Sequence, residues 1–162
     1  TLFPYTTLFR SDAVEKFTGA GRRFEFLGEY DGFMLADDYA HHPTEIKATL
    51  SAAKELDYNN VIAVFQPFTF SRTALLKDDF IKALSIADKV ILTPIMGSRE
   101  KNTYGIKSEN LAAGLHDVCV VDGFENIADK IEEIARPGDL VITMGGGDIY
   151  KAAHIIQGRH AE

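Results

Sequence analysis

The chain has 162 residues, and its 17 Lys and Arg against 24 Asp and Glu give a formal charge of −7. Hydrophobic residues make up 46% and charged residues 25%, which is typical of one globular domain and excludes a disordered chain. The longest apolar run, residues 61–65, is far shorter than the roughly 18 residues of a membrane span. Net acidity disfavours a nucleic-acid partner, and the single cysteine, Cys119, fits a reducing compartment. We therefore expect a cytoplasmic protein with neither a membrane nor a nucleic-acid partner.

The first eleven residues differ from the rest of the chain. They contain no acidic residue and no helical or strand period, and they lack the features of a secretory signal. We interpret residues 1–11 as a non-native artefact, residues 12–22 as the remnant of an interdomain linker, and residues 23–162 as the domain proper.

The domain begins with a predicted hairpin followed by a helix. Apolar and polar residues alternate over 24–30, and Asp31-Gly32 supplies the positive φ of a tight turn before a second strand at 33–36. Pro43 is typical of the first position of a helix. An apolar stripe at helical spacing follows it, made by Ile46, Leu50, Ala53 and Leu56.

Short apolar runs and helical patterns then alternate to the end of the chain. We expect strands at 61–65, 90–92, 118–121 and 140–143, a loop at 94–104, and short helices from 108, over 127–134 and over 149–156. A second helix is predicted to carry one apolar side made by Leu75, Leu76, Phe80, Ala83 and Leu84. This order predicts an α/β, Rossmann-like fold with an N-terminal β-hairpin and a mostly parallel sheet covered by helices on both faces. Ligands of such sheets bind at the carboxyl ends of the strands.

Three polar clusters follow predicted strands. Residues 37–43 read Asp-Asp-Tyr-Ala-His-His-Pro, which is compatible with a metal site, with a phosphate site, or with a cap by Asp38 beside solvated histidines. Zinc is disfavoured because no further Cys and His cluster has ligand spacing.

The second cluster is residues 65–73, where Arg72 lies near a helix start. Its guanidinium could clamp a carboxylate or a phosphate, or simply pair with Asp78 or Asp79. In the third cluster, 144–148, a triple glycine lets the backbone approach either a ligand or another segment closely, and it is weak as a nucleotide motif. The pair at 22 and 23, Arg-Arg, is by itself typical of a solvated surface.

Taken together, the strings RRFE, DDYAHHPTEI, FQPxxFSRT, GSRE and MGGGD resemble the C-terminal domain of the Mur ligase family. The resemblance extends from Phe17 to the end of the chain. The double histidine followed by Pro-Thr-Glu is most similar to the members that add L-alanine to UDP-N-acetylmuramate.

The resemblance implies a three-domain enzyme of peptidoglycan synthesis whose substrates are UDP-N-acetylmuramate, L-alanine and ATP. Such enzymes phosphorylate the muramate carboxylate with ATP and Mg²⁺, and the amine of alanine then displaces phosphate. ATP and Mg²⁺ would be bound mainly by the central domain, because this chain contains no Gly-Lys pair of a phosphate loop. We therefore expect this chain to be inactive without the N-terminal and central domains.

The resemblance also implies roles for individual residues. Arg23 would reach the nucleotide and Asp38 its ribose, while His41 and Tyr39 would line the space where alanine meets the activated carboxylate. Arg72 would hold the carboxylate of the amino acid. The family often has His-Arg where this chain has Phe68-Thr69. Many members carry Thr in place of that arginine, and Thr69 is a candidate substrate-binding residue. A second carboxylate-binding arginine is nevertheless missing, and Arg99 is a candidate substitute.

Other functions remain open at this stage. A sister muropeptide ligase that adds a peptide would share the domain. A stand-alone nucleotide- or anion-binding module would use the loop at Gly145. A receiver-like signalling domain is disfavoured because the strand at 61–65 is followed by Gln66 and not by a phosphoacceptor aspartate.

Overall fold

The computed structural model describes residues 22–161. Our interpretation of residues 1–11 and of 12–21 therefore lies outside the described residues. Within them the strands are β1 (Glu25–Tyr30), β2 (Phe33–Asp38), β3 (Val61–Phe65), β4 (Lys89–Leu92), β5 (Val118–Val120) and β6 (Leu140–Met144). They form one sheet in the order β1-β2-β6-β3-β4-β5, in which β1 is antiparallel to β2 and the other pairs are parallel. The expected mostly parallel sheet with a leading hairpin is confirmed.

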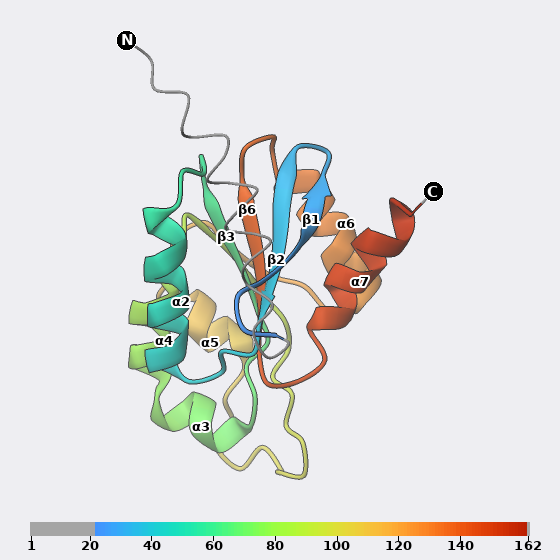
Figure 1. Cartoon of the computed structure of the whole chain (residues 1–162). Coiled ribbons are helices and arrows are strands. Elements are labelled where there is room, and N and C mark those ends of the chain that lie inside the picture. The colour runs from blue at the N-terminus through green and yellow to red at the C-terminus, as the bar shows by residue number, and fades with distance from the viewer. Residues whose placement is uncertain (1–21, 162) are drawn as a thin grey trace.

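Helices cover both faces of this sheet. They are α2 (Pro43–Glu55), α3 (Phe70–Leu75), α4 (Lys77–Leu84), α5 (Ser108–Ala112), α6 (Phe124–Ile134) and α7 (Tyr150–Arg159). As Figure 1 shows, α2, α4 and α5 lie on one face, α6 and α7 lie on the other, and α3 lies beyond the end of β3. No helix in this part of the chain has the length and apolarity needed to cross a bilayer.

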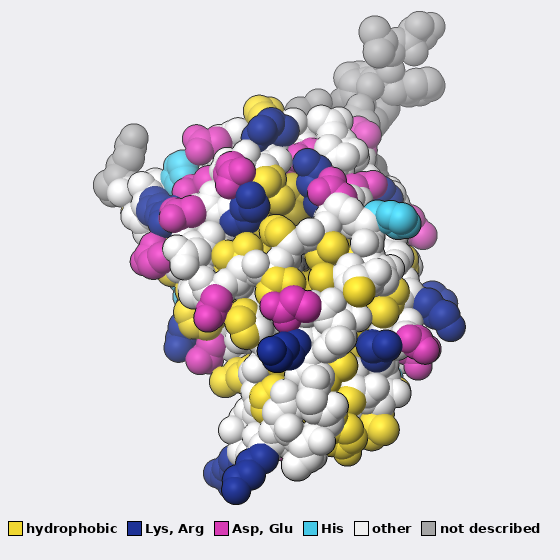
Figure 2. Space-filling model, turned by 180° about the vertical axis from the view of Figure 1, so that it is seen from behind, with side chains coloured by type: hydrophobic (Ala, Val, Ile, Leu, Met, Phe, Trp, Pro, Cys, Tyr) yellow, Lys and Arg dark blue, Asp and Glu magenta, His cyan; other side chains and the backbone are white. Residues whose placement is uncertain are grey.

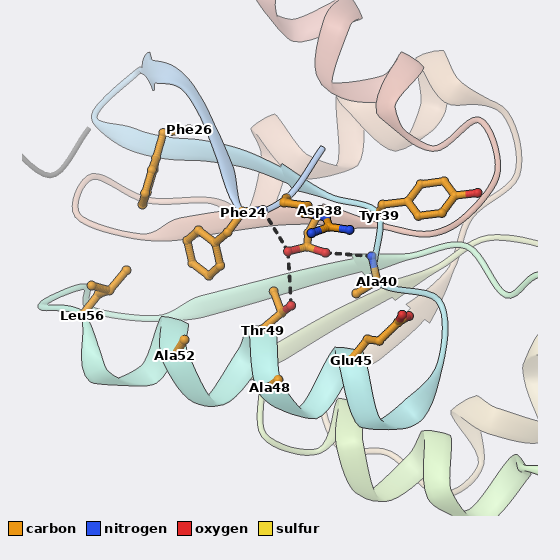
Figure 3. Close-up of a pocket in the computed structure, with 11 residues that line it drawn as sticks. Phe24, Phe26, Asp38, Tyr39, Ala40, Glu45, Ala48, Thr49, Ala52 and Leu56 are labelled. Atoms are coloured by element: carbon orange, nitrogen blue, oxygen red, sulfur yellow. Dashed lines mark hydrogen bonds between the residues drawn. The ribbon is translucent and has the colours of Figure 1, made fainter. Parts of the chain in front are cut away.

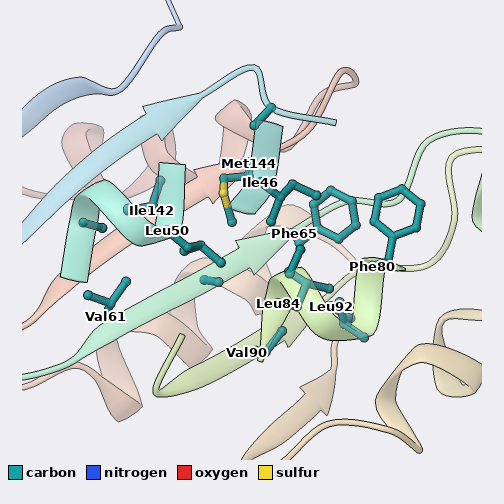
Figure 4. Packing of buried hydrophobic residues seen from close by; sticks show 14 of the residues in the cluster. Ile46, Leu50, Val61, Phe65, Phe80, Leu84, Val90, Leu92, Ile142 and Met144 are labelled. Atoms are coloured by element: carbon teal, nitrogen blue, oxygen red, sulfur yellow. The ribbon is translucent and has the colours of Figure 1, made fainter. Parts of the chain in front are cut away.

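The core consists of two apolar layers, one on each side of the sheet. Successive side chains of a strand point to opposite faces. In β3, Val61, Ala63 and Phe65 accordingly pack in the layer beneath α2 and α4, whereas Ile62 and Val64 pack beneath α6 and α7. Figure 4 shows the first layer, where Phe65 meets Phe80 of α4 at a ring separation of 5.5 Å. Helices cover both faces of the sheet, so the central strands are buried on both sides and consist almost entirely of apolar residues.

The surface behind the view of Figure 1 mixes acidic, basic and apolar side chains, without a large area of a single charge (Figure 2). A surface of this kind does not offer the clustered Lys and Arg that phosphate backbones require.

The predicted start of the domain is confirmed in detail. Asp31 and Gly32 form the hairpin turn with φ of 47° and 85°, and Pro43 is the first residue of α2. The N-cap of α2 is His42, whose ring accepts a hydrogen bond from Thr44 N–H while Glu45 reaches back to the cap backbone. The alternative in which Asp38 caps this helix is therefore wrong.

Two predicted apolar stripes are broken. The second helix is interrupted at Leu76, whose backbone leaves helical geometry (φ −108°, ψ 19°), so α3 and α4 are separate helices. Leu75 is consequently 73% exposed although Phe80 is buried. Leu56 is 41% exposed because α2 has already ended at Glu55 and Leu56 adopts an extended backbone.

Candidate functional site

The carboxyl ends of β2, β3, β4 and β6 lie at one edge of the sheet, because these strands are parallel neighbours. The three clusters singled out in the sequence follow β2, β3 and β6, so all three meet at this edge, as expected for the sheet type. The fold thus brings together segments that are about a hundred residues apart in the chain.

Asp38 is held firmly at the end of β2. Its carboxylate accepts hydrogen bonds from the backbone N–H of Phe24 (2.9 Å) and of Ala40 (2.7 Å) and from the hydroxyl of Thr49 (3.2 Å), as drawn in Figure 3. Burial raises the pKa of the Asp38 carboxyl, and these hydrogen bonds offset that effect only in part. Three of about four acceptor positions of the carboxylate are used, which leaves capacity for one ligand hydroxyl.

A pocket of about 620 Å³ lies between the hairpin and α2, with Asp38 in its wall. Most of its lining is apolar, including Phe24 and Phe26 from the hairpin side and Ala52 from α2. The exposed side chain of Arg23 contributes to it. The two residues expected to face a nucleotide, Arg23 and Asp38, therefore border the same pocket.

Tyr39 also lines this pocket and forms a pair with His41. The Nδ1 atom of His41 lies 3.0 Å from the carbonyl oxygen of Tyr39, and the two rings meet edge to face at 5.1 Å. Glu45 accepts hydrogen bonds from the N–H of His41 and His42, both at 3.0 Å. Although partial burial raises the pKa of Glu45, these bonds and the two imidazoles lower it overall.

Arg22 is a site residue that the sequence reasoning missed. Its guanidinium donates to Asp37 (2.8 Å) and to the carbonyls of Gly145 (3.0 Å) and Gly147 (3.2 Å). It also lies over the rings of Tyr39 and Tyr150, at 5.2 and 4.7 Å from their centres. The only local signal was the Arg-Arg pair, which does not reveal partners more than a hundred residues away.

The triple glycine serves close packing between protein segments. Gln66 Oε1 accepts the N–H of Asp148 (2.8 Å) and of Ile149 (3.1 Å), and a Cβ on Gly147 would lie 2.5 Å from that same oxygen. The carbonyls on either side of Gly146 are bound by Arg22. These contacts support close approach of the loop to another segment, and not to a ligand. They argue against the hypothesis of a stand-alone anion-binding module.

Arg72 lies in α3 with its Nη1 atom buried and without a hydrogen-bond partner. Thr69 precedes this helix with a φ of 66°, and its N–H donates to the carbonyl of Met96. The loop after β4 also docks on α3, where Glu100 accepts from the N–H (2.9 Å) and the hydroxyl of Ser71. Arg99, next to Glu100, is exposed. The structure thus places Arg99 near the helix that carries Arg72 and shows it in solvent.

The described residues do not form a metal centre of their own. Among residues 22–161, no three His, Cys, Asp or Glu side chains lie close enough together to hold a metal ion.

The fold and this edge define a ligase domain of a known family. The family described as Mur ligase, glutamate ligase domain, matches residues 22–147, and the chain belongs to this family. The expected kinship with Mur ligases is confirmed.

Within this family, the chain is similar to individual ligases that act on UDP-N-acetylmuramate and alanine. The chain is 48% identical over 149 residues to a UDP-N-acetylmuramate–L-alanine ligase of Caldicellulosiruptor saccharolyticus, a match that covers 90% of this chain and 33% of the relative. It superimposes on the UDP-N-acetylmuramate–alanine ligase of Thermotoga maritima with a TM-score of 0.69 at 26% identity, covering 95% of this chain and 35% of that one. The chain thus spans about a third of the length of these ligases.

The fold is also shared with a more distant enzyme. A bifunctional folylpolyglutamate synthase/dihydrofolate synthase of Yersinia pestis, complexed with AMPPNP and Mn, matches with a TM-score of 0.64 at 20% identity, covering 90% of this chain and 33% of that one. At this identity the match concerns the fold alone.

Proposed function

We propose that this chain is the C-terminal domain of an ATP-dependent ligase that joins L-alanine to UDP-N-acetylmuramate in peptidoglycan synthesis. Support comes from the relative at 48% identity, which carries this name and whose match covers 90% of the chain. We assign the remaining two-thirds of the relative's length to the N-terminal and central domains with which this domain would act, in the cytoplasm.

The observation that carries the proposal is the unpaired guanidinium nitrogen of Arg72. A buried donor without an acceptor costs about 1–3 kcal/mol, and Nη1 of Arg72 is such a donor. A ligand carboxylate would supply the missing acceptor, and a guanidinium binds a carboxylate in bidentate fashion. Within residues 22–161, the arginine expected to hold the carboxylate of alanine thus carries a buried donor that the fold leaves without an acceptor.

The proposed reaction has two steps. The muramate carboxylate attacks the γ-phosphorus of ATP, which forms an acyl phosphate and releases ADP. The amine of alanine then attacks the carbonyl carbon, the C–O bond to phosphate breaks, and the amine loses a proton. His41 would accept that proton or orient the amine, and Tyr39 would line the same space.

The nucleotide would approach the pocket bordered by Arg23 and Asp38. The free acceptor capacity of Asp38 suits a ribose hydroxyl, and the cation of Arg23 suits a phosphate. The related synthase from Yersinia pestis was crystallised with AMPPNP and Mn. Because this chain contains no Gly-Lys pair of a phosphate loop, we assign Mg²⁺ and most phosphate contacts to the central domain.

A chimaera tests the proposal. Residues 22–161 replace the corresponding third of the Caldicellulosiruptor saccharolyticus ligase, and ADP release is measured with UDP-N-acetylmuramate and L-alanine. We expect ADP release that requires both substrates and is lost in the Arg72→Met chimaera, and no turnover by the 162-residue chain alone. A folded chimaera that releases no ADP while the parent ligase does would contradict the proposal.

The amine on which ADP release depends distinguishes the proposed ligase from a sister ligase that adds a peptide. A sister ligase that adds a peptide would release ADP with a peptide amine and not with L-alanine. The same assay with L-alanine, with a tripeptide beginning in L-alanine, and with neither amine therefore distinguishes the two functions.

A further inference from the structure

We propose that Arg22 is a positioning residue for His41, which it holds in the tautomer that carries the proton on Nδ1. The inference rests on the proposed function for the role of the other ring nitrogen, Nε2. The geometry at Arg22 is independent of that function.

Arg22 is fixed through both its backbone and its side chain. Its N–H donates to Glu25 (3.1 Å), and its backbone adopts a φ of 63°, which is unfavourable for a residue other than glycine. Its guanidinium is anchored to the buried carboxylate of Asp37 at 2.8 Å. Asp37 is in turn held by the hydroxyl of Thr143 at 2.6 Å. These contacts hold the backbone and the side chain of Arg22 in one conformation despite its unfavourable φ.

The first route from Arg22 to His41 runs through Tyr39. The N–H of Tyr39 donates to the carbonyl of Arg22 at 2.6 Å, and the guanidinium lies over the ring of Tyr39. The carbonyl of Tyr39 then receives the Nδ1 proton of His41. Displacement of Arg22 would therefore move the acceptor on which the orientation of His41 depends.

The second route runs through the glycine loop. Arg22 binds the carbonyls of Gly145 and Gly147, and Gly146 lies between them. A Cβ on Gly146 would be only 3.3 Å from Cγ of His41, so the backbone of the loop packs against the imidazole ring. Arg22 thus holds Tyr39 through its backbone carbonyl and its guanidinium, and the same guanidinium holds the loop that packs behind the ring.

The consequence concerns the second ring nitrogen. A carbonyl oxygen only accepts, so the contact with Tyr39 requires a proton on Nδ1, and a neutral ring then has its lone pair on Nε2. Glu45, whose carboxylate lies 3.5 Å from Nδ1, favours the same tautomer. Nε2 is therefore left as the proton acceptor that attack by an amine requires.

The tautomer can be measured directly in the 162-residue chain by imidazole nitrogen NMR at a pH of about 8.5, which is about two units above the pKa of a free imidazole. We expect His41 to be mainly protonated on Nδ1. In Arg22→Gln we expect the ratio of the two tautomers to shift about fivefold toward Nε2–H, the factor that corresponds to one lost hydrogen bond of about 1 kcal/mol. Arg23→Gln removes the same charge from the neighbouring exposed residue and should leave the ratio unchanged.

The results that would overturn this inference differ from those that would refute the proposed function. An unchanged ratio in folded Arg22→Gln, or an equal shift in Arg23→Gln, would overturn the inference. If Arg22→Gln does not fold, Arg22→Lys decides the matter in the same way, because an ammonium keeps the charge but cannot reach Asp37 and both carbonyls in the same fork geometry. Failure of the chimaera to release ADP would refute the proposed function without altering the tautomer result, whereas an unchanged tautomer would refute this inference even in an active chimaera.

Discussion

The side-chain oxygen of Gln66 accepts the backbone N–H of Asp148 at 2.8 Å and thereby ties the end of β3 to the loop after β6. The same oxygen also accepts the N–H of Ile149, and Gln66 is only 7% exposed. One buried amide oxygen thus satisfies two backbone donors just before α7. This contact holds two of the three site segments in register.

Replacement of Gln66 by Leu should therefore destabilise the fold strongly. Two backbone donors would lose their acceptor, which we expect to cost about 2–6 kcal/mol, since each buried unsatisfied donor costs about 1–3 kcal/mol. Gln66→Glu keeps an acceptor oxygen and should lose less than half as much. Denaturant unfolding of the three chains measures the difference, and equal losses in both variants would contradict this account of Gln66.

The glycines predict opposite effects for two Gly→Ala substitutions. Gly147→Ala would place Cβ 2.5 Å from both Gln66 Oε1 and Met96 Sδ, so we expect a loss of about 1–3 kcal/mol from overpacking. At Gly158, in α7, a Cβ would meet no atom within 4 Å, and Gly158→Ala should gain about 0.5–1 kcal/mol from helix propensity. Thermal unfolding measures the stability of both variants. A destabilised Gly158→Ala would contradict the attribution of the two effects to overpacking and to helix propensity.

Arg72→Met should separate stability from activity. Because Met removes the unpaired buried donor at Nη1, we expect stability to be unchanged or higher by about 1 kcal/mol. In the chimaera the same variant should lose alanine-dependent ADP release by at least about 100-fold, the effect of about 3 kcal/mol of lost transition-state binding.

Arg99→Met is the matched control for that experiment. Arg99 is exposed, so its substitution should leave the unfolding curve unchanged within about 0.5 kcal/mol. If Arg99 substitutes for the missing second arginine, the variant raises the KM for alanine without the large loss expected for Arg72→Met. An unchanged KM would remove Arg99 from the candidate site.

Asp88 predicts a pH dependence of stability. Its carboxylate accepts hydrogen bonds from Lys54 Nζ (2.7 Å) and from the N–H of Val61 (2.7 Å). Although burial raises the pKa of Asp88, these two partners lower it below its usual range. The folded state then binds fewer protons than the unfolded state near a pH of about 4, so the contribution of Asp88 is complete above about pH 4 and is lost as the pH falls further.

Asp88→Asn tests this sign. We expect the variant to be less stable than the parent by about 1 kcal/mol at neutral pH, as for a half-exposed ion pair. The difference should shrink as the pH falls below about 4 and the parent carboxyl becomes protonated. Lys54→Met should likewise reduce the loss of stability that the parent shows as the pH falls below about 4. A difference that is constant over this range would show that the titration of Asp88 is not coupled to folding.

Much of the fold was predictable because it follows from local patterns. The turn at Asp31-Gly32 needs positive φ, Pro43 suits only the first turn of a helix, and the run at 61–65 is apolar enough to be buried on both faces. Each of these signals involves residues within a few positions of one another. The break at Leu76 was missed because an apolar stripe continues across it.

The candidate site was predictable only as a set of residue types. The pattern placed Asp38, His41, Arg72 and the glycine loop after strands, and the parallel sheet brings them to one edge as expected. It did not predict the partners of Arg22, because Gly145 and Gly147 lie 123 and 125 positions away. Nor did it predict that Gln66 satisfies the loop amides 82 positions further along.

The sequence by itself determined the strands, the helices other than the break between α3 and α4, and the family, because these depend on short-range periodicity and on characteristic strings. The tertiary structure decided the strand order, in which β6 lies between β2 and β3. That order turns the last glycine loop into the neighbour of both Arg22 and Gln66. Contacts of this kind depend on which strands pair, and strand pairing is settled by packing of the whole sheet and not by any local segment.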